Sequence, residues 1–337
     1  MTMRAVGYQS DCLELLDIEL PMPQASGHDL LVNVAAVGVN PVDAKVRRRE
    51  SPLAGTARVL GWDACGIVSS VGESVQGFSV GDRVWYAGAL QRPGCNSEWH
   101  LVDARLVSCA PRCLSAAEAA ALPLTAITAW ELLFDRLRLQ RSPSAHCGEI
   151  LLVVGAAGGV GSILVQLASA LTGITVVGTA SRPESQQWLR DLGVAHVINH
   201  QLPFGPQLQA LGLSGVGRVI SLTHTAQHFE ALVDVLEPQG ALALIDDPDP
   251  SAINVLALKR KSLSLHWELM FTRSLFQTDD MAEQGRILQQ VAELVDRGIV
   301  RSTLRELISP ISARNLEQAH QQLATDHAIG KLVLSGW

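Results

Sequence analysis

Short apolar stretches separated by Gly, Pro and Asp dominate the N-terminal part of the sequence. Examples are LLVNVAAVGV (30–39), GIVSSVG (66–72) and DRVWYAG (82–88). Short runs of β-branched and other apolar residues, bounded by turn residues, are typical of strands in a strongly bent sheet or small barrel. The pattern therefore predicts a β-rich N-terminal domain.

The pattern of apolar residues changes at about residue 115. The segment SAAEAAALPLTAITAWELLFDRL carries Ala and Leu at helical spacing, and Pro123 interrupts it. Because proline breaks a helix interior but fits a helix start, the segment predicts two helical pieces that join two domains.

Between 150 and 247, strand-like and helix-like runs alternate. ILLVV, ITVVGT, AHVIN, RVISL and GALALID resemble strands, with amphipathic stretches between them. This alternation predicts a doubly wound parallel sheet with helices on both faces. The segment 150–181 has no charged residue and could span a membrane by length. Its central glycine cluster divides it, however, and predicts strands and a helix buried in a parallel sheet instead.

The pattern changes again after residue 260. KSLSLHWEL resembles a strand, DDMAEQGRILQQVAELVDRG an amphipathic helix, and IGKLVLSGW a final strand. One face of the helix carries Met281, Leu288, Val291 and Val295, and Gly298 suits its end. The segment after residue 260 is too short to be a good candidate for a domain with its own hydrophobic core. We expect residues 1–124 and 262–337 to form one domain and 125–261 a Rossmann dinucleotide-binding domain.

Composition narrows the class of partners. The 337 residues are 47% apolar and 18% charged, with a net charge of -7, and basic runs such as Arg47–Arg49 are no longer than three residues. These values favour a compact globular protein and give no basic surface for nucleic acid or anionic lipid. The six cysteines form no CxxC pair, and the first residues lack a secretory signal. We therefore expect a cytoplasmic protein.

The stretch VVGAAGGVG lies between a predicted strand and a predicted helix. Its glycines Gly155, Gly158 and Gly161 allow a tight turn, a close approach of backbone N–H groups to a pyrophosphate, and close helix–strand contact. A purely structural glycine turn is the alternative. A second series of alternating strands and helices follows the loop, and this context favours dinucleotide binding.

The residues at the carboxyl end of the next strand distinguish an NAD site from an NADPH site. An NAD site usually carries Asp or Glu there, to accept a hydrogen bond from the ribose 2′-OH. This strand ends in GTASRPES, with Ser181 and Arg182 at the tip. A hydroxyl and a guanidinium suit a 2′-phosphate, so we predict NADPH. The alternative is that Arg182 is only a solvated loop residue before Pro183.

A metal site is not expected. Catalytic zinc requires three converging ligands from Cys, His, Asp and Glu. His196 and His200 flank a predicted strand, where their spacing gives no helical ligand face, and Cys109 and Cys113 have no nearby histidine in sequence.

Four segments together resemble a known family. VNPVDAKVR (39–47), LGWDACGIVSSVGESVQGFSVGDRV (60–84), AALPLTAITAWE (120–131) and VVGAAGGVG are similar to the zinc-independent quinone oxidoreductase branch of the medium-chain dehydrogenase/reductase superfamily. The resemblance covers nearly the whole chain. It implies an α/β fold with a GroES-like β-rich catalytic domain and a Rossmann domain. HWELMFTRS with the helix after it also resembles a subgroup often labelled "zinc-binding alcohol dehydrogenase family".

The positions that carry zinc ligands in the alcohol dehydrogenases of this superfamily are occupied differently here. The first loop has Asn40 and Asp43 in place of a cysteine, and Trp62 and Asp63 stand where a GHE sequence supplies a histidine. The third ligand would fall near Leu124 or Thr125. The four-cysteine structural lobe is also missing, since Cys95 stands alone.

The resemblance implies hydride transfer from NADPH to a quinone or to the β-carbon of an α,β-unsaturated carbonyl compound, with no catalytic metal. The negative charge would then fall on a conjugated oxygen, which hydrogen-bond donors or solvent can stabilise. It also implies cofactor contacts by Asn40, Thr128, Gly155, Gly158, Gly159, Val160, Gly161, Ser181, Arg182, Leu222, Thr223, His224, Ile245, Gly330 and Lys331.

Candidate catalytic residues are Asn40, Asp43 and Lys45. Lys45 is the best candidate for an electrophilic donor, because the chain has far more arginine than lysine; a surface or Asp-paired lysine is the alternative. Candidate substrate-binding residues are aromatic walls and one polar support beside them, for which core packing is the alternative. They are Trp62, Asp63, Trp267 and Phe271.

Other functions stay open at this point. A 2-enoyl thioester reductase would need a basic path for the coenzyme A phosphates, and a non-catalytic NADPH-binding sensor would need only the cofactor site. The expected partner is a small-molecule substrate, with neither nucleic acid nor membrane. By analogy we expect a homodimer formed through an edge strand of the Rossmann sheet.

Overall fold

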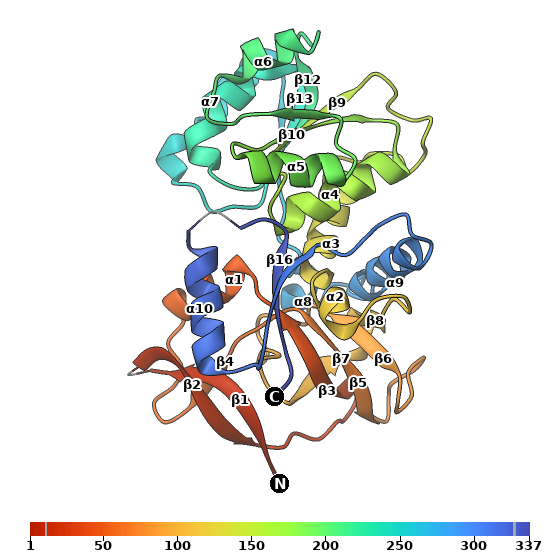
Figure 1. Cartoon of the computed structure of the whole chain (residues 1–337), viewed down its shortest axis with the longest axis vertical. Coiled ribbons are helices and arrows are strands. Elements are labelled where there is room, and N and C mark those ends of the chain that lie inside the picture. Colours follow the sequence, from red (N-terminus) through yellow and green to blue (C-terminus); the bar gives the residue numbers. More distant parts are fainter. Residues whose placement is uncertain (11, 326–327) are drawn as a thin grey trace. The chain divides into compact units, whose positions relative to one another are not determined.

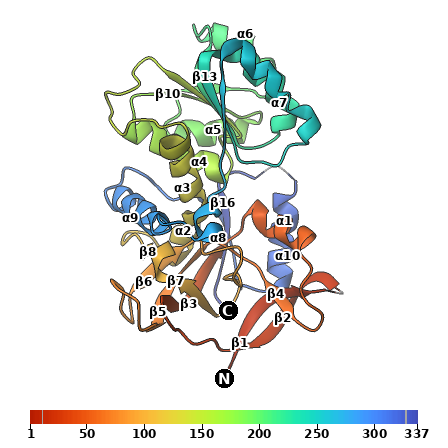
Figure 2. The ribbon, with the colours of Figure 1, turned by 180° about the vertical axis from the view of Figure 1, so that it is seen from behind.

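The computed structural model describes residues 1–10, 12–325 and 328–337, which form two compact units. Unit 1 comprises Met1–Ile127 and Met270–Trp337, and unit 2 comprises Thr128–Leu269 (Figures 1 and 2). No helix among the described residues is both long and apolar enough to cross a membrane.

Unit 1 is β-rich, as its pattern of short apolar runs predicts. A three-stranded sheet has the order β2-β1-β4, and a seven-stranded sheet the order β15-β16-β3-β5-β6-β8, with β7 paired to β3. The strands are β1 Thr2–Gln9, β2 Cys12–Pro21, β3 Asp29–Gly38, β4 Ala57–Val59, β5 Ala64–Val71, β6 Arg83–Tyr86, β7 Trp99–Asp103, β8 Val107–Cys109, β15 Leu304–Ile308 and β16 Lys331–Ser335.

The helices of unit 1 lie against these sheets. They are α1 Pro41–Arg49, α2 Ala116–Ala120, α8 Thr272–Phe276, α9 Glu283–Asp296 and α10 Ala313–Leu323, with a short 3-10 helix at Ala104–Leu106. The face of α9 that sequence periodicity predicts, including Leu288, Val291 and Val295, is buried. The final strand β16 pairs with β3 through Val333 and Gly38, so the C-terminal segment returns to the N-terminal sheet.

Unit 2 is a six-stranded parallel sheet with the order β11-β10-β9-β12-β13-β14. The strands are β9 Ile150–Val154, β10 Thr175–Thr179, β11 His196–Ile198, β12 Val216–Ser221, β13 Leu236–Leu244 and β14 Ser264–Trp267. The main helices are α4 Gly159–Leu171, α5 Pro183–Asp191, α6 Phe204–Ala210 and α7 Thr225–Val235. Helices α4 and α5 pack on one face of the sheet, and α6 and α7 pack together on the other (Figures 1 and 2).

The predicted helical connection consists of α2 and α3 (Pro123–Trp130), and Pro123 is the first residue of α3. A π-helical segment, Glu131–Arg136, continues α3, and 3-10 segments at Pro250–Ala252 and Val255–Lys261 precede β14.

One assignment differs from the sequence-based prediction. Ser264–Trp267 was placed with the β-rich domain, yet β14 pairs in parallel with β13 and completes the Rossmann sheet. The unit therefore ends at Leu269 instead of residue 261. A strand of four residues does not encode its partner, because pairing depends on which sheet edge is free.

Candidate functional site

The glycine loop of unit 2 has the geometry of a phosphate-binding turn. Gly155 directly follows β9 with a φ of 76°, a conformation that favours glycine, and Gly158 is the N-cap of α4. A Cβ atom on Gly161 would lie 2.4 Å from the backbone oxygen of Ala156, so only glycine fits this close approach. Gly159 and Val160 form the first turn of α4, whose N-cap has no side chain to bind its N–H groups. The loop therefore fits the pyrophosphate of a dinucleotide.

Ser181 and Arg182 lie beside this loop. Strand β10 is the neighbour of β9, and the Thr179 hydroxyl at its end accepts a hydrogen bond from the Gly155 N–H at 3.2 Å. Both residues are half-buried, and Arg182 is the N-cap of α5. No carboxylate occurs between the end of β10 and Arg182. A hydroxyl and a guanidinium therefore stand where an NAD site would have an acid.

His200 is a candidate cofactor residue that the sequence arguments missed. It follows β11, the neighbour of β10, and its Nδ1 atom is buried without a hydrogen-bond partner. Its ring centroid lies 6.1 Å from that of His228. Burial lowers the pKa of both histidines and so favours their neutral rings. The signal in the sequence is a histidine just past a strand that ends at the carboxyl edge of the sheet.

The residues expected under the nicotinamide follow the next two strands. Leu222, Thr223 and His224 come directly after β12, and Ile245 after β13. His224 has a φ of 53° and its Nδ1 pairs with the Thr223 hydroxyl at 2.8 Å. All these positions lie at the carboxyl edge of the parallel sheet, where α/β proteins bind ligands.

Two further predicted residues of unit 2 differ in exposure. Thr128 is buried in α3. Trp267 ends the outermost strand β14 and is 53% exposed. Its ring therefore has room for an external partner.

Unit 1 brings together four sequence segments at one buried polar cluster. Asp63 accepts a hydrogen bond from Asn40 Nδ2 at 2.7 Å, from Lys331 Nζ at 2.9 Å and from the Leu124 backbone N–H at 2.6 Å. Asp63 is completely buried and Lys331 is only 4% exposed. Burial raises the pKa of Asp63 above its ordinary value, while Lys331 and Asn40 oppose that rise. Because both carboxylate oxygens already accept from donors, the ionised form fits this geometry.

Asp43 lies in the first turn of α1, near this cluster. Its Oδ2 atom accepts from the Asn40 backbone N–H at 3.0 Å, and its buried Oδ1 atom has no hydrogen-bond partner. Burial raises the pKa of Asp43 to about 7, and the Asn40 N–H and the Lys331 charge oppose the rise. Asp43 therefore holds a proton more readily than an ordinary carboxyl group.

The positions of Lys45 and Gly330 say less about their predicted functional roles. Lys45 is half-buried on α1. Gly330 precedes β16 with a φ of 60° and directs the chain into the strand that begins at Lys331. The catalytic role of Lys45 stays a prediction.

Trp62 and Phe271 contact each other. Their ring centroids are 6.3 Å apart in an edge-to-face arrangement, and the side chains are 1% and 2% exposed. The Trp62 indole N–H donates to the Ala89 carbonyl at 3.2 Å. This burial matches the core-packing alternative, and a contact with substrate stays a prediction.

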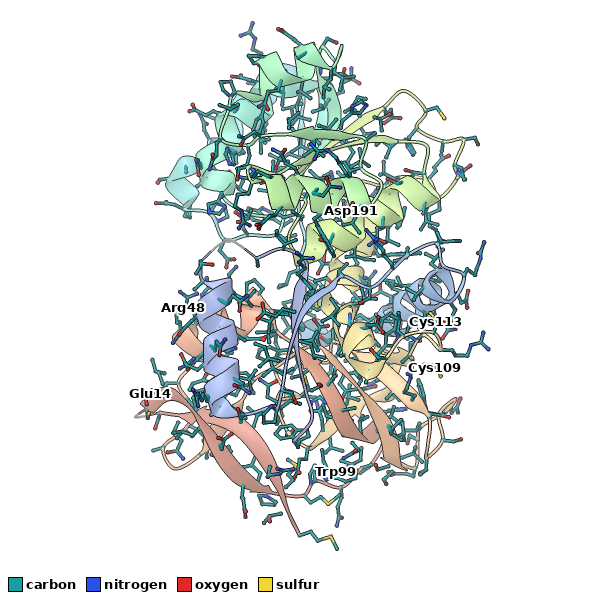
Figure 3. All side chains as sticks on the ribbon, in the orientation of Figure 1. Glu14, Arg48, Trp99, Cys109, Cys113 and Asp191 are labelled. Carbon is teal, nitrogen blue, oxygen red and sulfur yellow. The ribbon has the colours of Figure 1, made fainter. Side chains whose placement is uncertain are left out.

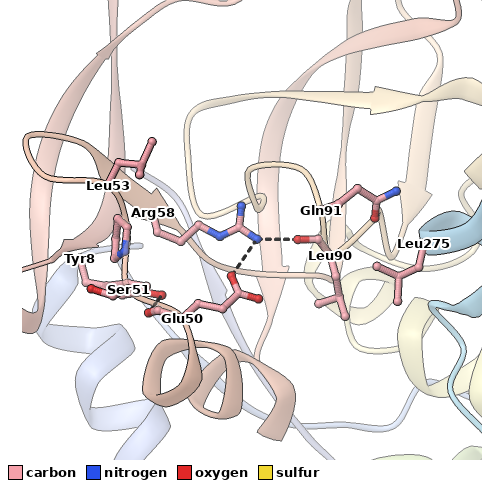
Figure 4. Close-up of a pocket in the computed structure, with 9 residues that line it drawn as sticks. Tyr8, Glu50, Ser51, Leu53, Arg58, Leu90, Gln91 and Leu275 are labelled. Atoms are coloured by element: carbon pink, nitrogen blue, oxygen red, sulfur yellow. Dashed lines mark hydrogen bonds and ion pairs between the residues drawn. The ribbon is translucent and has the colours of Figure 1, made fainter.

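A pocket of about 450 Å³ opens in unit 1 (Figure 4). Leu275, which lies one turn after Phe271, and Leu90, which follows Ala89, line it with seven other residues. Arg58 crosses it and donates to the Leu90 carbonyl at 2.5 Å, and its Nη2 lies 3.6 Å from Glu50. The Tyr8 hydroxyl donates to the Glu50 carbonyl at 2.8 Å. The remaining lining residues are Ser51, Pro52, Leu53 and Gln91.

Comparison with known proteins gives two family matches. Residues 26–113 match the alcohol dehydrogenase GroES-like domain, and residues 192–334 match the zinc-binding dehydrogenase domain. A "zinc-type alcohol dehydrogenase-like protein" of Staphylococcus epidermidis is 36% identical over 99% of both chains. The chain belongs to the medium-chain dehydrogenase/reductase superfamily.

Other members of this superfamily are also similar. The crystal structure of a candidate zinc-dependent alcohol dehydrogenase from Rhizobium etli is 51% identical, with a TM-score of 0.94 over 100% of this chain and 99% of that one. The quinone oxidoreductase of Sus scrofa is 29% identical over 94% of this chain and 92% of its own. The structure of a mycobacterial protein, Rv1454c, complexed with NADPH, is 26% identical, with a TM-score of 0.82 over 99% and 100% of the two chains.

The superfamily includes zinc enzymes, so the cluster around Asp63 was tested as a zinc site. Lys331 places an ammonium group, which cannot ligate zinc, against Asp63 and Asn40. Trp62 at the histidine position offers only an N–H donor, and that donor is already bound. Cys109 and Cys113 are exposed on the surface (Figure 3). Within the described residues, no group of three or more His, Cys, Asp or Glu side chains could hold a metal ion. The residues at this position therefore do not fit zinc.

Proposed function

We propose that this protein is an NADPH-dependent reductase that transfers a hydride to a quinone or an α,β-unsaturated carbonyl compound without a catalytic metal. The observation that carries the proposal is the buried Asn40–Asp63–Lys331 cluster, which puts an ammonium group beside positions that resemble those of zinc ligands in the alcohol dehydrogenases. Without a Lewis acid, simple alcohol oxidation lacks its usual means of stabilising an alkoxide. Reduction of a conjugated system places the new negative charge on an oxygen that hydrogen bonds can stabilise.

The residues of unit 2 support the cofactor part of this proposal. The N-terminus of α4 would hold the pyrophosphate, and Ser181 and Arg182 the 2′-phosphate. The carboxyl ends of β12 and β13 would support the nicotinamide, which, when bound, supplies the hydride. The NADPH complex of the mycobacterial relative agrees with this cofactor.

The residues of unit 1 would position the substrate. Asn40 is held rigidly by Asp63 and Lys331, which suits an orienting contact. Leu53, Leu90 and Leu275 give the pocket of Figure 4 an apolar part for the body of a flat substrate. The similarity to a quinone oxidoreductase supports this substrate class.

Loss of NADPH absorbance with a panel of acceptors tests the proposal. The panel holds benzoquinone and naphthoquinone, an enone, a 2-enoyl thioester and a saturated aldehyde, each with and without a metal chelator. We expect turnover with quinones or the enone, unaffected by the chelator. Tight NADPH binding without turnover would indicate a sensor. Preference for the thioester would indicate a 2-enoyl thioester reductase. Loss of activity with the chelator would refute the metal-free mechanism.

We also infer that the protein is a cytoplasmic homodimer formed through the edge strand β14. This strand is the last in the sheet order, and Trp267 and Leu269 beside it are largely exposed. Sedimentation of the wild type and of Trp267→Glu checks the inference, with the variant expected to be monomeric. A wild-type monomer would contradict it. Cell fractionation checks the location.

A further inference from the structure

Lys331 uses all three of its N–H groups within unit 1. Its Nζ donates to the Val39 carbonyl at 2.9 Å, to Asn40 Oδ1 at 2.6 Å and to Asp63 Oδ2 at 2.9 Å. An ammonium group has three donors and no acceptor. No N–H therefore remains for a cofactor, and the side chain points into the protein instead of completing a cofactor cleft.

This arrangement determines which way the Asn40 carboxamide points. Because Lys331 can only donate, the Asn40 oxygen must face it, and the Asn40 nitrogen must face the Asp63 carboxylate. Removal of the ammonium would remove one of the two groups that distinguish the amide orientations and would leave the Asn40 oxygen without its donor. The backbone makes the placement reproducible, since β16 pairs with β3 immediately before Asn40.

Lys331 also balances charge at a buried position. The Lys331 ammonium lowers the pKa of both Asp43 and Asp63, which burial raises. An unpaired carboxylate at this depth would be strongly disfavoured. Lys331 thus acts on both carboxylates and on Asn40 at the same time.

We propose that Lys331 is a positioning residue for hydride transfer: its buried ammonium holds Asn40 and Asp63 in one orientation and supplies a fixed positive charge beside the buried carboxylates. The proposal rests on the proposed function. Lys331 does not touch the substrate; it acts through Asn40.

Lys261 provides a matched control. Its Nζ also donates to three oxygens, the backbone carbonyls of Val233, Asp234 and Leu236 at 3.0, 2.7 and 2.7 Å. Those acceptors belong to the end of α7 and the start of β13, far in sequence from the cofactor loop. Loss of Lys261 should therefore reduce stability in the same manner without affecting the orientation of a site residue.

The test compares kcat and KM of Lys331→Met and Lys261→Met with an acceptor that the wild type reduces. For Lys331→Met we expect kcat to fall about 10- to 100-fold, as for other groups that orient a site residue, with KM for NADPH changed by less than about 3-fold. Lys261→Met should keep the wild-type kcat and show only a lower melting temperature. Equal kcat in both variants would overturn the proposal. A wild type without turnover would overturn the proposed function, and this proposal with it.

Two further variants keep the test decisive if Lys331→Met does not fold. Combining it with Asp63→Asn removes both buried charges, so the double variant should fold yet remain slow. Lys331→Ala lacks the Cγ, Cδ, Cε and Nζ atoms, which together correspond to propylammonium. We expect propylammonium to restore kcat in Lys331→Ala at least about 5-fold, and 1-propanol, which has the same shape but no charge, to restore none. Equal effects of the two additives would refute a role for the charge.

Discussion

Helices α1 and α4 begin in opposite ways, although both begin at a segment assigned to the site. At the start of α1, Asp43 places its own carboxyl group against the Asn40 N–H. At the start of α4, Gly158 has no side chain, and the first turn contains no acid. A helix N-terminus attracts negative charge in either case. Unit 1 therefore uses this attraction for its own structure, whereas in the proposed function unit 2 keeps it for a bound phosphate.

The largest expected effect comes from making α4 resemble α1. Gly158 has a φ of -73°, and a Cβ atom there would lie 3.4 Å from its nearest neighbour, an ordinary contact. Gly158→Asp should therefore fold and cap the helix with its own carboxylate. That carboxylate would repel the pyrophosphate, so we expect the Kd for NADPH, measured by fluorescence titration, to rise at least about 100-fold.

Gly158→Asn is the control for steric effects. It adds nearly the same volume and the same capping oxygen without the charge. If both variants bind NADPH equally, charge at this helix start does not matter, and the contrast between α1 and α4 has no functional meaning.

The second expected effect concerns the carboxyl group that α1 already has. An unfolded chain releases the Asp43 proton near the ordinary pKa of 3.8, whereas burial keeps it on the folded protein up to about pH 7. At Asp43 the folded state thus binds more protons than the unfolded state between these values, so this group gives the stability a downward slope from pH 4 to 7. The buried rings of His100 and His320, whose pKa is lowered to about 4, give an opposite slope. Asp43→Asn should remove the downward slope, which amounts to at most about 4 kcal/mol.

Urea unfolding at several pH values between 4 and 8 measures that slope. Asp103→Asn is the control, because hydrogen bonds from Arg105 lower the pKa of Asp103 and put its titration below this window. The slope of Asp43 is the difference between the wild type and Asp43→Asn, and an equal pH dependence of their stabilities would contradict the raised pKa of Asp43.

The smallest expected effect concerns Arg182, which we propose to bind the 2′-phosphate. Arg182→Ala removes the guanidinium beside Ser181 and should weaken NADPH about 10-fold, the value of one charge-assisted contact, while NADH binding stays the same. Arg190→Ala, on the exposed end of α5, controls for net charge. Equal losses for NADPH and NADH would show that Arg182 does not recognise the 2′-phosphate.

The sequence was sufficient for features that repeat locally. The alternation between 150 and 247 predicts the parallel sheet, and the spacing of Leu288, Val291 and Val295 predicts the buried face of α9. Gly155 and Gly161 could be found because their roles follow from backbone geometry within a few residues. These features depend on neighbours in the chain, which is why periodicity reveals them.

Features that depend on distant partners were not predictable. Lys331 lies 268 residues from Asp63 in the chain, and no local pattern shows that its side chain points inward. The edge strand β14 was assigned to the wrong domain for the same reason, since its pairing with β13 is a tertiary choice. The burial of Trp62 depends likewise on its contact with Phe271.

The separation of Asp63 from Lys331 also has a consequence for biosynthesis. The whole of unit 2 is translated between these two residues, so a nascent unit 1 contains the acid long before its cation. Until β16 is made and pairs with β3, Asp63 would be buried without its counter-charge, which disfavours early closure of this core. The ribosome thus delivers the two halves of unit 1 at different times, and the lysine completes the unit only when the second half arrives.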